Sequence, residues 1–362
     1  MRIVQMLPVF AFGDAIGNDT LALDKALKDN GYESAIYAEH VDDRVKYAAD
    51  MIAEYDNRPD DIILFHLSTG ADMNYKISEY DNPLIIMYHN ITPGSFFEKY
   101  DMNAYNVCES GRRAAKYLKK KATICIADSE YNKQELVEMG YECPIEVLPI
   151  LIAFDDYQKK PTESVIEKYK DGYTNIVFTG RVAPNKKHED LIATFSYYKK
   201  YINPKSRLLL VGRYDFFPEY YRRLQKYVEQ LGVEDVIFTG QVKFPDILAY
   251  YKVADVFLCL SEHEGFCVPL VESMMFDVPV IAYDSCAVGE TLGGSGLLLN
   301  DKTPAVVAEA IERVRTDECL KQTIIENQKI RLKYFEHSRI NAQFIDIINR
   351  LVQINMRMNN DE

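Results

Sequence analysis

The chain has 362 residues, of which 48% are hydrophobic and 27% charged, a composition typical of globular proteins and not of long disordered tracts. Its formal net charge of −13 disfavours a general nucleic-acid-binding protein, because the phosphate backbone attracts basic surfaces. The length exceeds that of one usual domain, so we expect two domains, with a cleft available between them.

The first half alternates short β-branched runs with amphipathic segments. Its apolar runs are "RIVQMLPV", "SAIYA", "DDIILFHLS", "PLIIMYHN" and "ATICIADS". Near-continuous apolar strands separated by helices are typical of a parallel sheet that is covered on both faces. The sequence therefore predicts an α/β fold.

The same pattern restarts after the polar stretch 161–173, "PTESVIEKYKDGY", which resembles a linker between domains. The second half contains the apolar runs "NIVFTG", "SRLLLVG", "DVIFTG", "DVFLCLS", "PVIAYD" and "GLLLN". Both halves therefore look doubly wound and Rossmann-like, with domains expected at 1–160 and 161–340. A last amphipathic helix at about 341–362 is expected to pack back on the first domain.

Seven cysteines are scattered along the chain without CxxC or metal-type spacing, and most lie in apolar runs. They are predicted to be reduced core residues. No run approaches about 18 apolar residues, and the N-terminal run is too short for a signal peptide. We expect a cytoplasmic protein, either free or resting on the inner face of the membrane without spanning it.

Ligands of open parallel sheets bind beyond the carboxyl ends of the strands. At one such end, "NIVFTGRVAPNKK" finishes a predicted strand at Gly180 and places Arg181 and Lys186 in the following loop. Two fixed cations there suit a diphosphate, because arginine bridges oxygens bidentately and lysine supplies a compact charge. The ordinary alternative is a solvated basic loop.

The stretch "LSEHEGFCVPLVE" places Glu264 just beyond another buried strand and Glu272 about one turn inside the next helix. Gly265 permits an unusual turn, and Pro269 fits the first turn of a helix. The helix start would point backbone N–H groups at an anionic phosphate. These groups belong to Phe266, Cys267 and Val268.

Together, "GRVAPNK", "ADVFLCLS", "EHEGFCVPLVE" and "VPVIAYD" resemble the retaining glycosyltransferases of family 4, which have the GT-B fold. The resemblance covers nearly the whole chain and is strongest from 175 to 300. It implies that Glu264 contacts the donor sugar and that Glu272 binds the ribose. It also implies that Arg181 and Lys186 hold the diphosphate and stabilise the leaving group, with no metal and no cofactor.

The resemblance extends to loops in both halves. Gly240 and Val242, in "TGQV", are similar to the loop that borders the nucleotide base. His89 follows a buried strand at a position similar to the family's histidine near the sugar, although it could instead serve local loop hydrogen bonds; His66 is the weaker candidate. Gly13 and Asp14 lie in a first loop where the family often has Gly-Gly.

Two further departures from the family pattern concern positions where glycine is frequent. Cys267 follows "EGF", and Asp277 lies near a helix end. We expect Asp277 to adopt the left-handed conformation, which Asp tolerates better than most residues.

The stretch "GRRAAKYLKKK" forms a basic patch, in contrast to the negative net charge of the whole chain. Six basic residues occur there with no acid between them: Arg112, Arg113, Lys116, Lys119, Lys120 and Lys121. The ordinary interpretation is a solvated helix face. The alternative is a surface for an anionic membrane or for a lipid-linked acceptor that carries diphosphate.

The resemblance implies a retaining transferase that moves a hexose-type residue from a nucleotide-diphosphate sugar to a glycan or polyprenyl-linked acceptor, in surface polysaccharide or glycoconjugate synthesis. A nucleotide-sugar epimerase of the GT-B fold and a catalytically silent sugar-nucleotide-binding subunit stay open as rivals. A dinucleotide dehydrogenase is disfavoured, because no G-x-G-x-x-G follows the first strand. These motifs leave the donor base and sugar, the acceptor, the linkage and the oligomeric state undetermined.

Overall fold

The structure is a computed structural model that describes the backbone of residues 1–11 and 13–360 and the side chains through residue 353. The chain divides into two compact units. Unit 1 comprises Met1–Gly94, Asn103–Ala153 and Phe335–Glu362, and unit 2 comprises Ser95–Met102 and Phe154–Tyr334. The boundaries expected from the sequence, 160/161 and 340/341, lie seven and six residues beyond the divisions at 153/154 and 334/335. The assignment of Ser95–Met102 to unit 2 was not predicted from the sequence.

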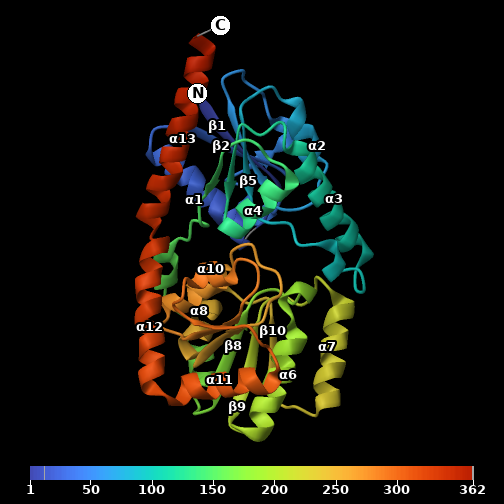
Figure 1. Ribbon diagram of the computed structural model, residues 1–362, viewed down its shortest axis with the longest axis vertical. Helices are drawn as coiled ribbons and strands as arrows, with labels where there is room; N and C mark the ends of the chain where they lie inside the picture. The colour runs from blue at the N-terminus through green and yellow to red at the C-terminus, as the bar shows by residue number, and fades with distance from the viewer. Residues whose placement is uncertain (12, 361–362) are drawn as a thin grey trace. The chain divides into compact units, whose positions relative to one another are not determined.

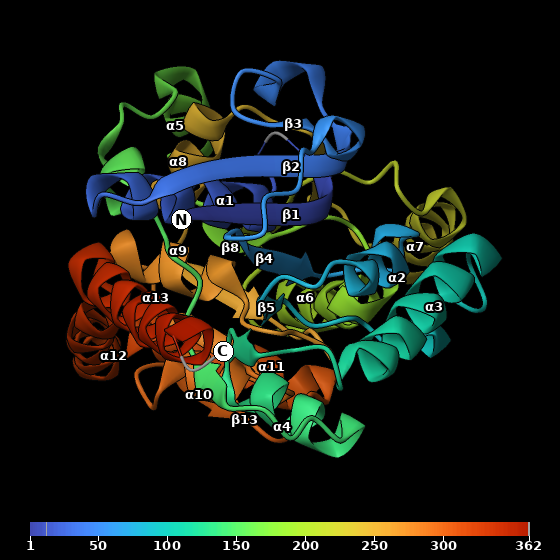
Figure 2. The ribbon, with the colours of Figure 1, turned by 90° about the horizontal axis from the view of Figure 1, so that it is seen from above.

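Unit 1, which includes the strands labelled β1, β2 and β5 in Figure 1, contains a seven-stranded sheet. The strand order is β3-β2-β1-β4-β5-β6-β7. All of its strand pairs are parallel, as the continuous apolar runs predict, and Figure 2 shows β2, β1 and β4 side by side. The strands are β1 (Arg2–Phe10), β2 (Glu33–Val41), β3 (Asp50–Met51), β4 (Ile62–Leu67), β5 (Leu84–Tyr88), β6 (Ile124–Ala127) and β7 (Ile145–Val147).

Helices cover both faces of this sheet. Because successive strand residues point to opposite faces, neighbouring residues pack against different helices. The helices are α1 (Ala15–Asp29), α2 (Met73–Lys76), α3 (Met102–Leu118), α4 (Glu130–Met139) and α13 (His337–Asn360). Ile3 packs in a cluster with α1 and α13, which supplies Phe344. Its neighbour Val4 packs in the opposite cluster, with residues of α2, α3 and α4. The last helix therefore packs on unit 1.

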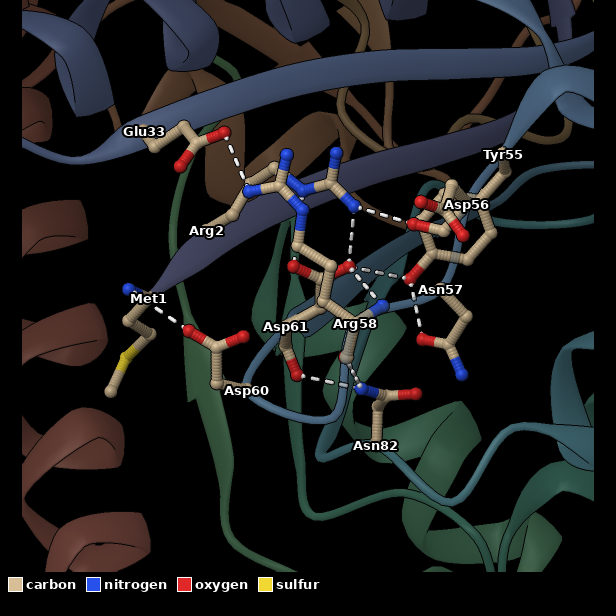
Figure 3. A network of polar contacts seen from close by, with 10 residues as sticks. All are labelled: Met1, Arg2, Glu33, Tyr55, Asp56, Asn57, Arg58, Asp60, Asp61 and Asn82. Carbon is tan, nitrogen blue, oxygen red and sulfur yellow. Dashed lines mark hydrogen bonds and ion pairs between the residues drawn. The ribbon is translucent and has the colours of Figure 1, made fainter.

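A polar network closes the amino ends of β1 and β4 (Figure 3). Arg2 at the start of β1 donates to Asp61, just before β4, at 3.0 and 2.6 Å, and both side chains are buried. The Tyr55 hydroxyl donates to the same carboxylate at 2.9 Å. A buried ion pair with these extra bonds fixes the register of the two strands at the edge opposite to their carboxyl ends.

Unit 2 contains a six-stranded sheet in the order β10-β9-β8-β11-β12-β13, again with every pair of strands parallel. The strands are β8 (Thr174–Thr179), β9 (Ser206–Val211), β10 (Val236–Gly240), β11 (Val256–Cys259), β12 (Val280–Tyr283) and β13 (Leu297–Leu299). Its helices are α5 (Glu163–Tyr169), α6 (His188–Tyr201), α7 (Pro218–Leu231), α8 (Phe244–Val253), α9 (Val268–Met275), α10 (Val288–Leu292), α11 (Pro304–Thr316) and α12 (Glu318–Leu332).

The predicted linker at 161–173 is wrong. Most of this stretch is helix α5, which belongs to unit 2. Tyr169 at the end of α5 is buried in a core cluster with Val177 of β8 and Tyr250 of α8. The charges of the stretch lie on the helix surface, and its apolar residues provide the packing face that a linker would lack.

The cysteines are free, as predicted, but they are not all core residues. Cys125, Cys259 and Cys267 are buried, whereas Cys319 is exposed on α12. Within the described part of the chain, no helix combines the length and the apolar character needed to cross a membrane.

Helix α9 is bracketed by two residues in the left-handed conformation. Cys267 at its N-cap has φ 72°, and Asp277 just beyond its end has φ 56°. The prediction for Asp277 is confirmed. The prediction that Gly265 supplies the unusual turn is corrected, because the left-handed residue in this turn is Cys267. Pro269 lies in the first turn of α9, as expected.

Three glycines mark the carboxyl ends of adjacent strands in unit 2. Gly180 follows β8, Gly212 follows β9, and Gly240 ends β10 with φ 71°. A Cβ atom on Gly212 would lie 2.3 Å from the carbonyl oxygen of Gly180. The backbones of the β8 and β9 loops therefore approach too closely for any side chain at position 212.

Replacing Gly212 by alanine tests this close approach. The φ of Gly212 is 148°, so the variant meets both backbone strain and a backbone clash. We expect G212A to lower the free energy of unfolding by about 2 kcal/mol or more. Gly172 has φ 87° with open space around it, so G172A should lose only about 1 kcal/mol. Equal losses for the two variants in urea unfolding would contradict the clash.

Candidate functional site

The two chemical motifs of unit 2 lie in loops that are joined by hydrogen bonds to backbone carbonyls. The Asn185 side chain donates to the carbonyl of His263 at 3.1 Å, and the Glu262 N–H donates to the carbonyl of Asn185 at 2.9 Å. A third loop joins them, since the Ala287 N–H donates to the carbonyl of Glu264 at 3.2 Å. The loops after β8, β11 and β12 therefore form one connected structure at the carboxyl edge of the sheet.

At the centre of these loops, Lys186 and Glu264 form an ion pair. The Lys186 Nζ atom lies 2.5 Å from Glu264 Oε2, and Glu264 is only 6% exposed. Burial lowers the pKa of Lys186, but the Glu264 carboxylate more than offsets this and holds that pKa above its usual value. Glu264 Oε1 is buried and has no hydrogen-bond partner. An unpaired buried carboxylate oxygen is costly, which makes it a ready acceptor for a ligand hydroxyl.

Arg181 lies in the same loop as Lys186 but differs in its surroundings. Its side chain is exposed, and its guanidinium stands 5.8 Å from the centroid of the Phe216 ring. The structure thus provides one cation that is partly buried and paired, and a second that is exposed and able to meet an anion from solvent.

Glu272 lies one turn inside α9, as predicted, and its carboxylate is held by two tyrosines. The Tyr157 hydroxyl donates to Oε1 at 2.5 Å, and the Tyr251 hydroxyl donates to Oε2 at 2.6 Å. Burial raises the pKa of Glu272, and the two hydroxyls oppose this shift. A carboxylate has about four acceptor positions, so this geometry fixes Glu272 and leaves capacity for further donors. No sequence pattern identified these two tyrosines as its partners.

The other predicted donor-binding residues of unit 2 occupy neighbouring loops. Phe266 and Cys267 are buried, and Val268 is the first residue of α9. Gly240 packs against the Tyr214 ring, and Val242 is half-buried beside the cluster of Tyr169 and Val177.

A group of buried ligand atoms surrounds Glu264. Cys259, Glu264 and Cys267 offer atoms within 4.8 Å of one another. Thiolates suit soft metal ions such as zinc or copper(I), so these residues are the ones in unit 2 that could hold a metal. Lys186 already neutralises the carboxylate of this set.

Several partners of this site were missed from the sequence. The Phe96 ring, in the short segment that belongs to unit 2, lies 5.9 Å from the His263 ring. Lys302 binds both Asp190 and Glu262. Contacts of this kind depend on loop folding and have no periodic signal.

In unit 1, His89 follows β5 as predicted, but hydrogen bonds within the unit engage both of its ring nitrogens. Nδ1 lies 3.0 Å from Asp128 Oδ2, and Nε2 lies 2.8 Å from His66 Nδ1. The weaker candidate His66 therefore belongs to the same group, and its own Nε2 lies 3.0 Å from Gln5 Oε1. Asp19 is also near, but these four nitrogens are taken, so the set does not fit a metal ion.

The loop after His89 is fixed by a second polar network. Asn90 has φ 69°, and its side chain donates to Asn132 and to Glu135, each at 2.8 Å. Gly13 and Asp14 lie in the exposed first loop, where Asp14 is the N-cap of α1 without a capping side-chain bond.

Only some residues of the basic patch are exposed to solvent. Arg112 donates to the carbonyl of Ile91 at 2.9 Å and to Glu135 at 3.1 Å, so it supports the network around Asn90 and does not belong to a solvent-facing patch. Lys119 is half-buried. The exposed members are Arg113, Lys116, Lys120 and Lys121.

Comparisons with known proteins agree with these motifs. Residues 159–331 match the family model described as "Glycosyl transferases group 1". The serotype-specific mannosyltransferase WbdA of Escherichia coli is 22% identical over 95% of this chain, which spans only 43% of that relative's length. A Campylobacter jejuni α-1,4-N-acetyl-D-galactosaminyltransferase, named for an undecaprenol-diphosphate-linked substrate, is 27% identical over 48% of this chain and 47% of its own.

Solved structures match over nearly the whole chain. Sucrose-phosphate synthase from Thermosynechococcus elongatus superposes with a TM-score of 0.78 at 17% identity, covering 98% of this chain and all of the other. Anabaena HepE, solved with UDP-glucose, has a TM-score of 0.77 at 19% identity, covering 97% of this chain and all of HepE. The predicted resemblance is confirmed: the chain has the GT-B fold, and its residues 159–331 match the family model of the glycosyl transferases group 1.

Proposed function

We propose that this protein is a retaining glycosyltransferase that moves a sugar from a nucleotide-diphosphate donor to a glycan or lipid-linked acceptor, in polysaccharide or glycoconjugate synthesis. The observation that carries the proposal is the Lys186–Glu264 pair, in which the buried Glu264 Oε1 has no partner. The names of the matched relatives, a mannosyltransferase and an N-acetylgalactosaminyltransferase, support the same class of reaction.

Three charged residues of the site in unit 2 then have a role in the transfer. Glu264 Oε1 would accept a hydroxyl of the donor sugar, which removes the cost of its unpaired state. Lys186 and Arg181 would bind the diphosphate and stabilise the charge that develops on it as the bond to the sugar breaks. Fixed cations perform this task without a metal ion, so we propose metal-independent transfer.

The first test removes the two members of the ion pair. K186A and E264Q should each lower transfer from a nucleotide sugar on the order of 100-fold or more, because each deletes a preorganised charge at the reaction centre. Release of nucleoside diphosphate measures the rate over a panel of donors, with and without EDTA. The exposed α7 variant K226A provides the matched control.

Wild-type rates in both folded variants would contradict the assignment. Loss of activity in EDTA that added divalent metal restores would contradict metal independence. Appearance of an epimer of the donor in the absence of acceptor would instead favour the epimerase, and donor binding without turnover would favour a silent subunit.

The second test concerns Glu272 as the ribose ligand. E272Q should raise the KM for the donor about 10-fold or more while changing kcat less, because it weakens binding that is common to the ground state and the transition state. Y157F should also raise the KM, but by a smaller factor, because it removes the hydrogen bond that positions one carboxylate oxygen of Glu272. A fall in kcat at unchanged KM would contradict this role.

We further propose that the exposed end of α3 contacts an anionic membrane surface or acceptor. Each basic residue near such a surface contributes about 1 kcal/mol. The double variant K116Q/K120Q should therefore reduce co-sedimentation with vesicles that contain phosphatidylglycerol, in a salt-dependent way. The control K226Q/K252Q makes the same change in net charge with exposed residues of unit 2. Equal binding by both double variants would contradict a specific patch.

A further inference from the structure

A continuous chain of hydrogen bonds runs through the interior of unit 1. It begins at the main-chain carbonyl of Thr20, which lies 3.1 Å from Gln5 Nε2. It continues from Gln5 Oε1 to His66 Nε2 at 3.0 Å, from His66 Nδ1 to His89 Nε2 at 2.8 Å, and from His89 Nδ1 to Asp128 Oδ2 at 3.0 Å. All four side chains belong to buried residues.

The carbonyl of Thr20 fixes the direction of this chain. A carbonyl oxygen can only accept, so the Gln5 amide must turn its NH₂ group toward Thr20. The flipped amide would place two oxygens against each other and is excluded. The Gln5 oxygen therefore faces His66, and since this oxygen also only accepts, His66 Nε2 must carry a hydrogen.

Counting the remaining hydrogens shows that two neutral rings are too few. Three contacts need one hydrogen each: Gln5 to His66, His66 to His89, and His89 to Asp128. Two neutral imidazoles supply one hydrogen each, and an ionised carboxylate supplies none. The set is satisfied only with one additional proton. On His66 this proton would lie one ring away from Asp128, whereas on His89 it lies next to the carboxylate, and an imidazole binds a proton more tightly than a carboxylate does. The geometry therefore favours a His89 ring that donates through both Nε2 and Nδ1.

The ring geometry supports a hydrogen between the two histidines. The planes of His66 and His89 are within 2° of each other, with centroids 5.1 Å apart. The facing nitrogens are much closer, at 2.8 Å, so the rings lie edge to edge and not face to face. In this arrangement the N–H bond points along the line between the nitrogens, which is the favoured direction.

We propose that His89 is held as an imidazolium ion against the carboxylate of Asp128, and that Gln5 is the positioning residue that imposes this state through His66.

The charges around the two rings agree with this assignment. Burial lowers the pKa of His89, but Asp128 and, more weakly, Asp19 and Asp14 raise it above the usual value. Burial and the neighbouring His89 hold the pKa of His66 well below its usual range. Burial raises the pKa of Asp19 to about 7, and its carboxylate accepts the Leu151 N–H at 2.7 Å.

The consequence for chemistry, which rests on the proposed function, is that His89 does not exchange a proton with substrate. Both of its nitrogens are engaged, and its side chain is 1% exposed. It would act as a fixed positive charge below the loop that begins at Asn90. The residue resembles the family's histidine near the sugar, but here its protonation state is set from within unit 1.

The protonation states can be measured without any assay of activity. Histidine labelled with ¹⁵N gives NMR signals that distinguish a ring with two N–H groups from a ring with one, and the chain has six histidines. At pH 7.5 we expect both nitrogens of His89 to be protonated and His66 to be protonated at Nε2 alone. H66Q and H89Q assign the signals. A bare nitrogen on His89 at this pH would overturn the proposal.

The role of Gln5 is tested by Q5M, which keeps the length of the side chain and removes the acceptor. His66 can then carry its hydrogen at Nδ1 and donate to His89, so the pKa of His89 should fall by at least about one unit. Y141F removes another buried bond to a carbonyl in unit 1 and should leave this pKa unchanged. An unchanged value in folded Q5M, or an equal fall in Y141F, would overturn the role of Gln5.

The link to transfer is tested separately by the pH profile. Because His89 must lose its charge as pH rises through its pKa, the rate of Q5M should decline at a lower pH than that of the wild type. If the NMR spectrum shows that His89 is an imidazolium but Q5M and the wild type have the same pH–rate profile, the charge state of His89 stands. The proposed effect of that charge on transfer is then contradicted. Failure of the proposed function would appear instead as absence of transfer in the wild type.

Discussion

The parallel arrangement of strands is the constraint on which the rest of this structure depends. In both sheets every described strand pair is parallel, so the carboxyl ends of all strands meet at one edge. Sequence motifs far apart in the chain are thereby brought to neighbouring loops. Lys186 and Glu264 are separated by 78 residues, yet each follows a central strand of the same sheet. The ion pair is a direct result of that topology.

At this edge, backbone contacts hold the loops and side-chain contacts hold the charges. The close approach of Gly212 to Gly180 and the bonds from Asn185 to the loop of Glu264 leave little freedom for Lys186. Preorganised charges of this kind need no rearrangement when charge develops on a substrate. In unit 1 a charged side chain is held in a similar way by other groups. The hydrogen-bonded chain of Gln5, His66 and Asp128 fixes the ring of His89 in the interior of the unit.

The sequence allowed the strands, the order of motifs and the positions of Glu264, Glu272 and His89 relative to their strands to be predicted, because these follow from hydrophobic periodicity and from turn chemistry. It could not reveal the partners of those side chains. His66 was undervalued because its contact with His89 depends on register, which pairs His66 with Met87 and Leu67 with Tyr88. The helix α5 was mistaken for a linker because its charges obscured one short apolar face.

The assignment of Ser95–Met102 to unit 2 has a consequence for how the protein can be divided. The chain passes from one unit to the other at 94/95, 102/103, 153/154 and 334/335, so neither unit is a contiguous stretch. Cutting after residue 153 would strip α13 from the N-terminal sheet and leave the apolar face around Ile3 bare. A fragment limited to 159–331 would lack the aromatic residues that pack on His263 and Phe217. Neither unit can therefore be obtained as one contiguous fragment of the chain, although each contains a sheet of its own.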